Sequence, residues 1–337
     1  DPIGSRGLGD VYKRQVVHFV LSEEFAGIEQ HVDELLSNKL NKDPILICNN
    51  SIANNFDDSI FVYKIKNLGR RSLYGKYKLN QLLKKINPDV VHTHGSKTSS
   101  IISSINKNQF KHVATVHGIK KNKKVYKKAD FVIGVSKKAI DGIENNVDVV
   151  TNWWNPKLAK FNKKKNEYAL AIGRLEKVKG FDLLINSWVN IETNLVIVGS
   201  GKERNKLAHM INSKGLNEKI KIIDSVKKGE LVEYYRNAKL LIISSIDEGG
   251  PRVALEALYL QIPVISTNVG HMPMILPKEL LAPANDQNSL QNLLESYVDK
   301  IDNLNQDAIF EFVTKEFSID EKITQIRGIY ESLLKRR

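Results

Sequence analysis

Residues 239–257 read KLLIISSIDEGGPRVALEA, and this stretch decides the fold. The apolar run Lys239 to Ser244 predicts a strand, and Pro251 marks the first turn of a helix. Between them Glu248 stands in a glycine-containing loop, and Glu256 follows eight residues later inside the helix. Such a turn points free backbone N–H groups and the positive helix end at an anion, while the carboxylates accept hydrogen bonds from hydroxyls. The stretch therefore favours a ligand with both phosphate and sugar hydroxyls.

The rest of the chain alternates short β-branched runs with amphipathic stretches. This alternation predicts parallel strands joined by crossover helices, with both faces of each sheet covered. The pattern breaks at residues 151–165, which have the composition of a linker. We therefore predict an α/β protein of two Rossmann-like, doubly wound domains that face a cleft. The expected strands are 16–20, 44–48, 60–65, 90–94, 112–117 and 131–136 in the first series, and 168–172, 194–198, 219–223, 239–244 and 263–267 in the second.

The domain limits follow from the same pattern. Residues 1–15 show no periodicity, and we expect a non-native or disordered leader there. Residues 16–155 are expected to form the first domain and residues 156–310 the second. The helices of residues 311–337 are expected to pack back toward the first domain, with a helix start capped by Ser318 and an apolar stripe after it.

Composition limits the partners. The 51 basic and 38 acidic residues among 337 leave a net charge of +13, which favours polyanions or an anionic membrane surface. For the lysine cluster around residues 120–128 we favour a solvated surface, with a bilayer contact second and a nucleic-acid site last. The single cysteine, Cys48, rules out a disulfide within the chain and indicates a reducing, cytoplasmic setting. No apolar run reaches the roughly 18 residues of a membrane span, so any membrane contact is expected to be peripheral.

Two further loops of the second series carry candidate ligand contacts. After the strand 168–172 come Gly173, Arg174 and Lys179. The guanidinium offers a fork of donors that matches a diphosphate, and the ammonium adds a mobile point charge. The Gly199-Ser200-Gly201 turn follows the next strand. It resembles part of a dinucleotide fingerprint, but a tight strand-to-helix turn explains it equally well.

Histidines and tryptophans leave alternatives open. His94 and His117 follow strands of the first series and are candidates for substrate contact, for ordinary core packing or, least favoured, for a metal site. Trp153 and Trp154 stand near the hinge, where they either stack on a ligand on the acceptor side or pack the linker. The chain contains no Asp-x-Asp motif, so we expect no metal and no other cofactor.

Several motifs in one order resemble glycosyltransferase family 4, the retaining enzymes of the GT-B fold. The first domain contributes Gly27-Ile28-Glu29, Asp89-Val90-Val91-His92-Thr93-His94 and Thr115-Val116-His117-Gly118. The second contributes Gly173-Arg174-x4-Lys179-Gly180, Val198-Gly199-x-Gly201, Glu248-x7-Glu256-Ala257 and Pro263 to Gly270. Two motifs depart from the family pattern: Gly270-His271-Met272-Pro273-Met274 replaces Gly-Gly-x-Pro-Glu, and Asn152-Trp153-Trp154-Asn155 replaces Asn-Gly-Val-Asp.

The resemblance implies a role for each matching residue. Arg174 and Lys179 would hold the donor diphosphate, and His117 would lie near the reacting sugar carbon. Glu248 would contact the transferred sugar and Glu256 the ribose hydroxyls. The remaining donor-binding positions would be Gly27, Gly173, Gly199, Gly249, Gly250, Pro251 and Arg252. Departing diphosphate carries negative charge, so fixed cationic donors and a helix N-terminus would stabilise the transition state.

We therefore expect a hexosyltransferase. It would move a sugar from a nucleotide-sugar donor, a UDP-sugar first, to a glycan or lipid-linked acceptor with retention, in cell-envelope polysaccharide synthesis. The setting would be cytoplasmic, with a possible contact to an anionic membrane and no nucleic-acid partner. The alternatives are a nucleotide-sugar epimerase of the same shape and a non-catalytic subunit that resembles a glycosyltransferase.

Overall fold

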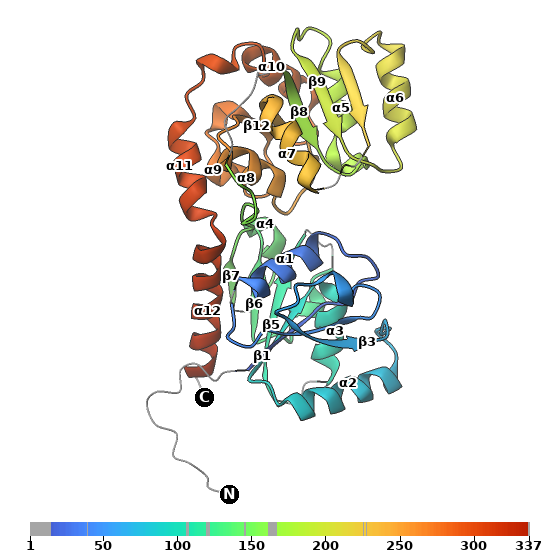
Figure 1. Ribbon diagram of the computed structural model, residues 1–337, viewed down its shortest axis with the longest axis vertical. Coiled ribbons are helices and arrows are strands. Elements are labelled where there is room, and N and C mark those ends of the chain that lie inside the picture. The colour runs from blue at the N-terminus through green and yellow to red at the C-terminus, as the bar shows by residue number, and fades with distance from the viewer. Residues whose placement is uncertain are drawn as a thin grey trace, which may run out of the picture. The chain divides into compact units, whose positions relative to one another are not determined.

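The computed structural model describes residues 15–335 except 39, 106–107, 119–121, 145, 161–166, 225 and 227. All but one residue of the expected leader, and part of the lysine cluster, lie outside the described residues. By its contacts the chain divides into two compact units. The N-terminal unit comprises Asp1–Val150 and Lys322–Arg337, and the C-terminal unit comprises Thr151–Glu321. Each unit is a parallel sheet with helices around it (Figure 1).

The N-terminal unit contains a seven-stranded sheet in the order β3-β2-β1-β4-β5-β6-β7. The order reverses between β1 and β4, so the loops after these neighbouring strands open at a topological switch point. The strands are β1 Val16–Phe19, β2 Ile45–Asn49, β3 Phe61–Ile65, β4 Val90–His94, β5 Lys111–Val116, β6 Phe131–Gly134 and β7 Val147–Val149. The helices before the last strand are α1 Gly27–Ser37, α2 Leu73–Ile86, α3 Ser96–Ile105 and α4 Lys137–Ile140.

The C-terminal unit contains a six-stranded sheet in the order β10-β9-β8-β11-β12-β13. Here the switch point lies between β8 and β11, which precede the loops of Lys179 and Glu248. The strands are β8 Tyr168–Ile172, β9 Asn194–Val198, β10 Ile220–Ile223, β11 Ala238–Ile243, β12 Val264–Thr267 and β13 Leu281–Ala282. The helices are α5 Phe181–Asn186, α6 Arg204–Ser213, α7 Lys228–Asn237, α8 Arg252–Tyr259, α9 Met272–Ile275, α10 Gln287–Tyr297 and α11 Asp307–Glu316.

Strand β8 shows why the sequence of this unit folds as a covered sheet. Ala169 and Ala171 belong to a core cluster that also contains Trp188 of the segment after α5. Leu170, between them, belongs to the opposite cluster, which includes the buried residues of α8. Because successive strand side chains point to opposite faces, a continuous apolar run supplies both cores.

The last two helices, α11 and α12, belong mainly to different units. α11 lies within the C-terminal unit, where it packs against α8. α12 spans Ile319–Lys335, and from Lys322 onward its contacts are with the N-terminal unit. The Ser318 hydroxyl accepts from the backbone N–H of Glu321 at 3.3 Å, as the capping pattern predicts. The expected apolar stripe is buried at Ile323, Ile326, Ile329, Tyr330 and Leu333.

The sequence pattern missed two strands. β7 has three residues and β13 has two, and both stand at the end of their sheets. Strands this short contain no alternation or apolar run to detect. They are defined only by their pairing, β7 with β6 and β13 with β12. The two doubly wound parallel sheets are otherwise those that the alternation predicts. Among the described residues, no helix combines the length and apolar character needed to cross a membrane.

Candidate functional site

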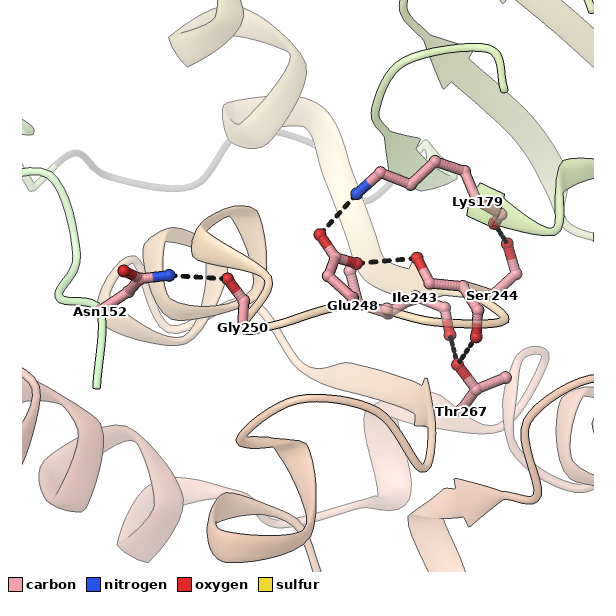
Figure 2. Close-up of polar contacts among 8 residues, drawn as sticks. Asn152, Lys179, Ile243, Ser244, Glu248, Gly250 and Thr267 are labelled. Carbon is pink, nitrogen blue, oxygen red and sulfur yellow. Dashed lines mark hydrogen bonds and ion pairs between the residues drawn. The ribbon is translucent and has the colours of Figure 1, made fainter. Parts of the chain in front are cut away.

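Lys179 and Glu248 meet where β8 and β11 end (Figure 2). The Lys179 Nζ lies 2.5 Å from Glu248 Oε1, and Ser245 Oγ donates to Glu248 Oε2 at 2.8 Å. The two side chains of the pair are only 16% and 18% exposed. A cation and a carboxylate 69 residues apart in sequence are thus held together in a partly desolvated position.

Hydrogen bonds hold the two loops against each other. Ser244 Oγ donates to the carbonyl of Lys179 at 2.9 Å, and the backbone N–H of Ile246 donates to the carbonyl of Val178 at 2.8 Å. Gly180 has a φ of +63°, and a Cβ there would lie 2.1 Å from the carbonyl oxygen of Ser244. Only glycine permits this approach, because the obstacle is backbone and cannot rotate away.

Hydrogen bonds from a third strand, β12, also hold the Glu248 loop in place. Thr267, the last residue of β12, donates its hydroxyl to the carbonyl of Ser245 at 2.7 Å, with a longer contact of 3.3 Å to that of Ile243 (Figure 2). Thr267 is 1% exposed, so the bond is shielded from water. Sequence reasoning singled out neither Thr267 nor Ser245. The signal available was a run of polar residues at the carboxyl ends of neighbouring strands.

Two glycines, one before Lys179 and one after the next strand, leave room for the loop that carries Lys179. A Cβ at Gly173 would lie 3.3 Å from Cε of Lys179, so the lysine stem passes directly over this position. Gly199, after β9, lies against the same loop: a Cβ there would be 1.8 Å from the Gly173 carbonyl oxygen. The strand pairing continues into the loop, with Leu175 N–H donating to Ser200 at 2.8 Å. Gly173 and Gly199 therefore shape the loop that carries Lys179.

Arg174 does not join the pair. Its side chain is 73% exposed, and Nη1 donates to Glu176 Oε1 at 2.9 Å. The structure thus brings Lys179 to Glu248 and leaves Arg174 five residues earlier on the same loop, facing another carboxylate. Exposed ion pairs contribute only about 0–1 kcal/mol, so this contact is easily exchanged for another anion.

The start of α8 is closely packed. Pro251 occupies the N-cap position before Arg252. Asn152 Nδ2 donates to the carbonyl of Gly250 at 2.9 Å (Figure 2). A Cβ at Gly250 would lie 2.5 Å from His271 Nδ1. Both Asn152 and His271 come from the two motifs that depart from the family pattern. Asn152 itself matches the family's asparagine, whereas His271 is a departing residue that lies against the glycine loop, where Gly249 is buried.

Glu256 lies one turn inside α8 and is 8% exposed. Its Oε2 accepts a hydrogen bond from the Tyr235 hydroxyl at 3.0 Å. Burial and this neighbouring carboxylate raise the pKa of Tyr235 well above its ordinary value, so the phenol stays a donor. Tyr235 therefore fixes the orientation of the Glu256 carboxylate, a role that its position in the sequence did not suggest.

The tryptophans are packing residues in this structure. Trp153 is 0% exposed, and the guanidinium of Arg252 lies 5.8 Å from its ring centroid. Trp154 stacks on Tyr259 with ring centroids 3.9 Å apart and donates Nε1–H to the carbonyl of Thr314 at 3.3 Å. Of the two interpretations of this pair, packing of the linker is the one that the contacts support. Trp153 has no exposed surface to offer a sugar, whereas Trp154 is partly exposed.

The N-terminal unit gathers histidines at its switch point. His94 Nδ1 and His117 Nε2 lie 3.1 Å apart, and His94 Nε2 lies 3.0 Å from His18 Nδ1. Two sets have ring nitrogens close enough to share a metal ion: His18, His92 and His94, and His31, His94 and His117. Gly27 begins α1, and a Cβ there would meet nothing within 4 Å, so packing alone does not require glycine at this position.

Burial keeps these imidazoles neutral. It lowers the pKa of His18 and of His117 to about 3. It also lowers the pKa of His92 and His94 well below the ordinary value, and the neighbouring histidines lower both further. A neutral imidazole has one donor nitrogen and one acceptor nitrogen, so each ring has a defined tautomer.

Comparison with known proteins decides the family. A model described as "Glycosyl transferases group 1" matches residues 155–308, and one described as "Glycosyltransferase Family 4" matches residues 25–152. The chain belongs to glycosyltransferase family 4. The glycine loops, the Lys179–Glu248 pair and His117 all lie inside the matched ranges.

One relative of this family 4 chain matches most of its length, and a second matches about a third of it. An uncharacterized glycosyltransferase of Methanocaldococcus jannaschii is 25% identical over 339 residues, 91% of this chain and 95% of that protein. The amylovoran biosynthesis glycosyltransferase AmsD of Erwinia amylovora is 36% identical over 109 residues, 32% of this chain and 30% of that protein. The Anabaena protein HepE, solved in complex with UDP-glucose, superposes with a TM-score of 0.75 at 15% identity, over 94% of this chain and 99% of that one. This last likeness shows that the chain shares the GT-B fold.

Proposed function

We propose that the C-terminal unit binds a UDP-sugar and that the protein transfers its hexose to a glycan or lipid-linked acceptor. The observation that carries the proposal is the Lys179–Glu248 pair, held 2.5 Å apart, with Glu248 in the loop that leads into α8. An ammonium, backbone N–H groups at a helix start and a carboxylate that accepts from hydroxyls are the partners that suit a nucleotide sugar. The UDP-glucose bound by HepE and this chain's membership of the family support this choice of donor.

Each contact has a role in the reaction. When the donor binds, Lys179 exchanges part of its contact with Glu248 for the diphosphate, and Glu248 turns its carboxylate to the sugar hydroxyls. Arg174 leaves Glu176 for the same diphosphate. Glu256, oriented by Tyr235, accepts from the ribose hydroxyls. These are hydrogen bonds between charged groups and the ligand, the strong class of such bonds.

Catalysis then follows from charge. Cleavage of the sugar–phosphate bond leaves negative charge on the departing UDP and positive character on the sugar carbon. Lys179, Arg174 and the N–H groups of Gly249, Gly250 and Arg252 stabilise that negative charge, so we propose that the transfer needs no metal ion or other cofactor. In this proposal the anomeric configuration is retained, and His117 of the N-terminal unit contacts the reacting sugar.

We propose that the acceptor belongs to a cell-envelope polysaccharide, in line with the amylovoran role named for AmsD. A donor screen that detects released nucleotide tests the whole proposal. The purified protein is incubated with UDP- and GDP-sugars, with and without an extract of glycan and lipid-linked acceptors. We expect acceptor-dependent release of UDP. An altered sugar without acceptor would instead indicate an epimerase, and the absence of any nucleotide binding by calorimetry would reject the donor site.

We also propose that the N-terminal unit contacts an anionic membrane through α2 and the adjoining strand β3. Phe61, Leu73, Tyr74 and Tyr77 are between 61% and 82% exposed. Helix α2 carries four lysines and no acidic residue, and Lys78 Nζ lies 4.6 Å from the centroid of the Tyr74 ring. Exposed aromatic rings beside lysines fit the headgroup region of an anionic bilayer, where each lysine contributes about 1 kcal/mol.

Vesicle cosedimentation tests this surface. We expect binding to vesicles that contain phosphatidylglycerol and not to vesicles of phosphatidylcholine alone. The double variant Tyr74→Ser, Tyr77→Ser should lose most of it. Val189→Ser is the matched control, because it removes another exposed apolar side chain, from the C-terminal unit. Equal binding to both vesicle types would reject the membrane contact.

A further inference from the structure

A chain of hydrogen bonds runs through the N-terminal unit from α12 to His117. The Tyr330 hydroxyl lies 3.4 Å from His18 Nε2. His18 Nδ1 lies 3.0 Å from His94 Nε2, and His94 Nδ1 lies 3.1 Å from His117 Nε2. The rings of His18 and His94 each form hydrogen bonds through both nitrogens. The direction of the hydrogen bond at Tyr330 therefore fixes the direction of every other bond as far as His117.

The sheet places these rings in one line. His18 of β1 pairs in register with His92 of β4, and His94 pairs with Thr115 of β5. Because residues two apart on a strand share a face, His92 and His94 project together. His18, His92 and His94 are at most 3% exposed, so water does not compete for their bonds.

A branch at Tyr330 decides the direction of the chain. The Tyr330 hydroxyl lies 2.6 Å from His92 Nδ1, and His92 Nε2 lies 2.6 Å from Thr115 Oγ1. The neutral His92 ring can accept through only one nitrogen, so one of these two hydroxyls must donate and the other must accept. A phenol, with an ordinary pKa of about 10, is the stronger acid of the two, so Tyr330 donates to His92. Burial holds the pKa of Tyr330 well above that value, so the proton stays in place.

The remaining links then follow one by one. Tyr330, having donated its proton to the bond with His92, accepts from His18 Nε2–H. His18 Nδ1 accepts from His94 Nε2–H, and His94 Nδ1 accepts from His117 Nε2–H. His117 therefore carries its single proton on Nε2, and its Nδ1, which this chain does not use, is a hydrogen-bond acceptor. The opposite direction would reverse every bond and make Nδ1 a donor.

We propose that Tyr330 is a positioning residue that sets the tautomer of His117 through His18 and His94. The unprotonated Nδ1 of His117 then accepts a hydrogen bond from a hydroxyl of the sugar substrate. This assignment of a ligand rests on the proposed function, whereas the tautomer itself does not. Helix α12, more than 200 positions after His117 in the sequence, thereby fixes which nitrogen of the His117 ring can accept a hydrogen bond.

The network is complete without a metal ion. Both ring nitrogens of His18, His92 and His94 already have a hydrogen-bond partner within it. A metal would have to displace several of these bonds and would convert the rings from donors and acceptors to ligands. Hydrogen bonding accounts for the positions of the rings, and the experiment below separates the two possibilities.

Nuclear magnetic resonance of the full chain, labelled with ¹⁵N at histidine, reads the tautomer directly. We expect a protonated, pyrrole-type Nε2 and an unprotonated, pyridine-type Nδ1 for His117, assigned by loss of its signals in His117→Gln. Tyr330→Phe removes only the hydroxyl and should give a mixture of the two tautomers at His117. Thr115→Val, which removes the acceptor at the far end of the branch, should do the same, while Thr115→Ser should keep the parent pattern.

Tyr63→Phe is the matched control, since it removes a tyrosine hydroxyl of the same unit outside the chain. An unchanged His117 pattern in both Tyr330→Phe and Thr115→Val would overturn the proposal. A parent protein that already shows both tautomers, or stoichiometric zinc that moves the signals of His18, His92 and His94 together, would overturn it as well. Because none of these readings involves nucleotide, failure of the donor assignment would leave them interpretable. If UDP-sugar transfer is found, Tyr330→Phe should lower kcat several-fold with little change in donor KM.

Discussion

Replacing Lys179 with methionine removes the ammonium of the candidate site and keeps the length of the side chain. In the free protein this ammonium lies 2.5 Å from Glu248, in a pair less than one-fifth exposed. A hydrogen bond to a charged group contributes about 1.5–3 kcal/mol. Because Lys179 already has a carboxylate partner, binding of UDP exchanges one anion for another, and the lower end of that range applies. We expect UDP to bind about tenfold more weakly, since 1.4 kcal/mol corresponds to a factor of ten.

Replacing Glu248, the other member of the pair, should not weaken UDP binding. Glu248→Gln releases the ammonium from its carboxylate, so UDP should bind as tightly as in the parent or more tightly. Sugar transfer should nevertheless fall, because the amide is a weaker acceptor for the sugar hydroxyls than a carboxylate. The two substitutions thus separate diphosphate binding from sugar binding within one pair of residues.

Calorimetry with UDP measures both effects, and Lys177→Met is the matched control. Lys177 belongs to the same short 3₁₀ turn as Lys179, and its side chain is exposed. The reasoning is refuted if Lys179→Met and Lys177→Met bind UDP equally well. Urea unfolding serves as a check on folding, where Lys179→Met should cost about 1–3 kcal/mol through the carboxylate left behind.

Three further outcomes are expected. Gly199→Ala should cost about 3 kcal/mol or more in urea unfolding, because its Cβ would lie 1.8 Å from the Gly173 carbonyl oxygen, and parent-like stability would contradict that packing. Tyr235→Phe should weaken UDP binding by leaving Glu256 without its hydroxyl donor, and unchanged calorimetry would remove Glu256 from the ribose contact. The N-terminal unit should lose stability as the pH falls below about 6.5, by up to about 1.4 kcal/mol per pH unit for each of His18 and His117. Their folded pKa of about 3 lies below the unfolded value, so the unfolded chain binds the extra protons, and flat urea midpoints between pH 7 and pH 5 would contradict it.

The sequence predicted the elements near the candidate site well because their signals are local. The run before Ser244, the glycines after it and Pro251 at the helix start lie within a few residues of one another. Propensity and periodicity operate on that scale, so β11, its loop and α8 follow from them. The order of the motifs along the chain predicted the family, and the two family models confirm that prediction.

The same local signals could not place the supporting residues. Thr267 reaches Ser245 from the next strand, and Tyr235 reaches Glu256 from the preceding helix. Neither pairing has a fixed spacing in sequence, because strand register and helix packing set it. Trp153 shows the same limit: its place in the linker left stacking on a ligand and packing of the linker equally open, and the structure shows that its ring is buried.

By itself, the sequence determined that two parallel sheets form and that glycine loops and charged residues follow their strands. Hydrophobic periodicity and turn-forming residues are properties of sequence neighbours, so they can be recognised without knowledge of the tertiary structure. Only the tertiary structure decided that Lys179 pairs with Glu248 while Arg174 does not. It alone joined Tyr330 to a line of histidines from three separate strand regions. Such contacts depend on which strands become neighbours and in which register, and that choice is made by burial across the whole unit.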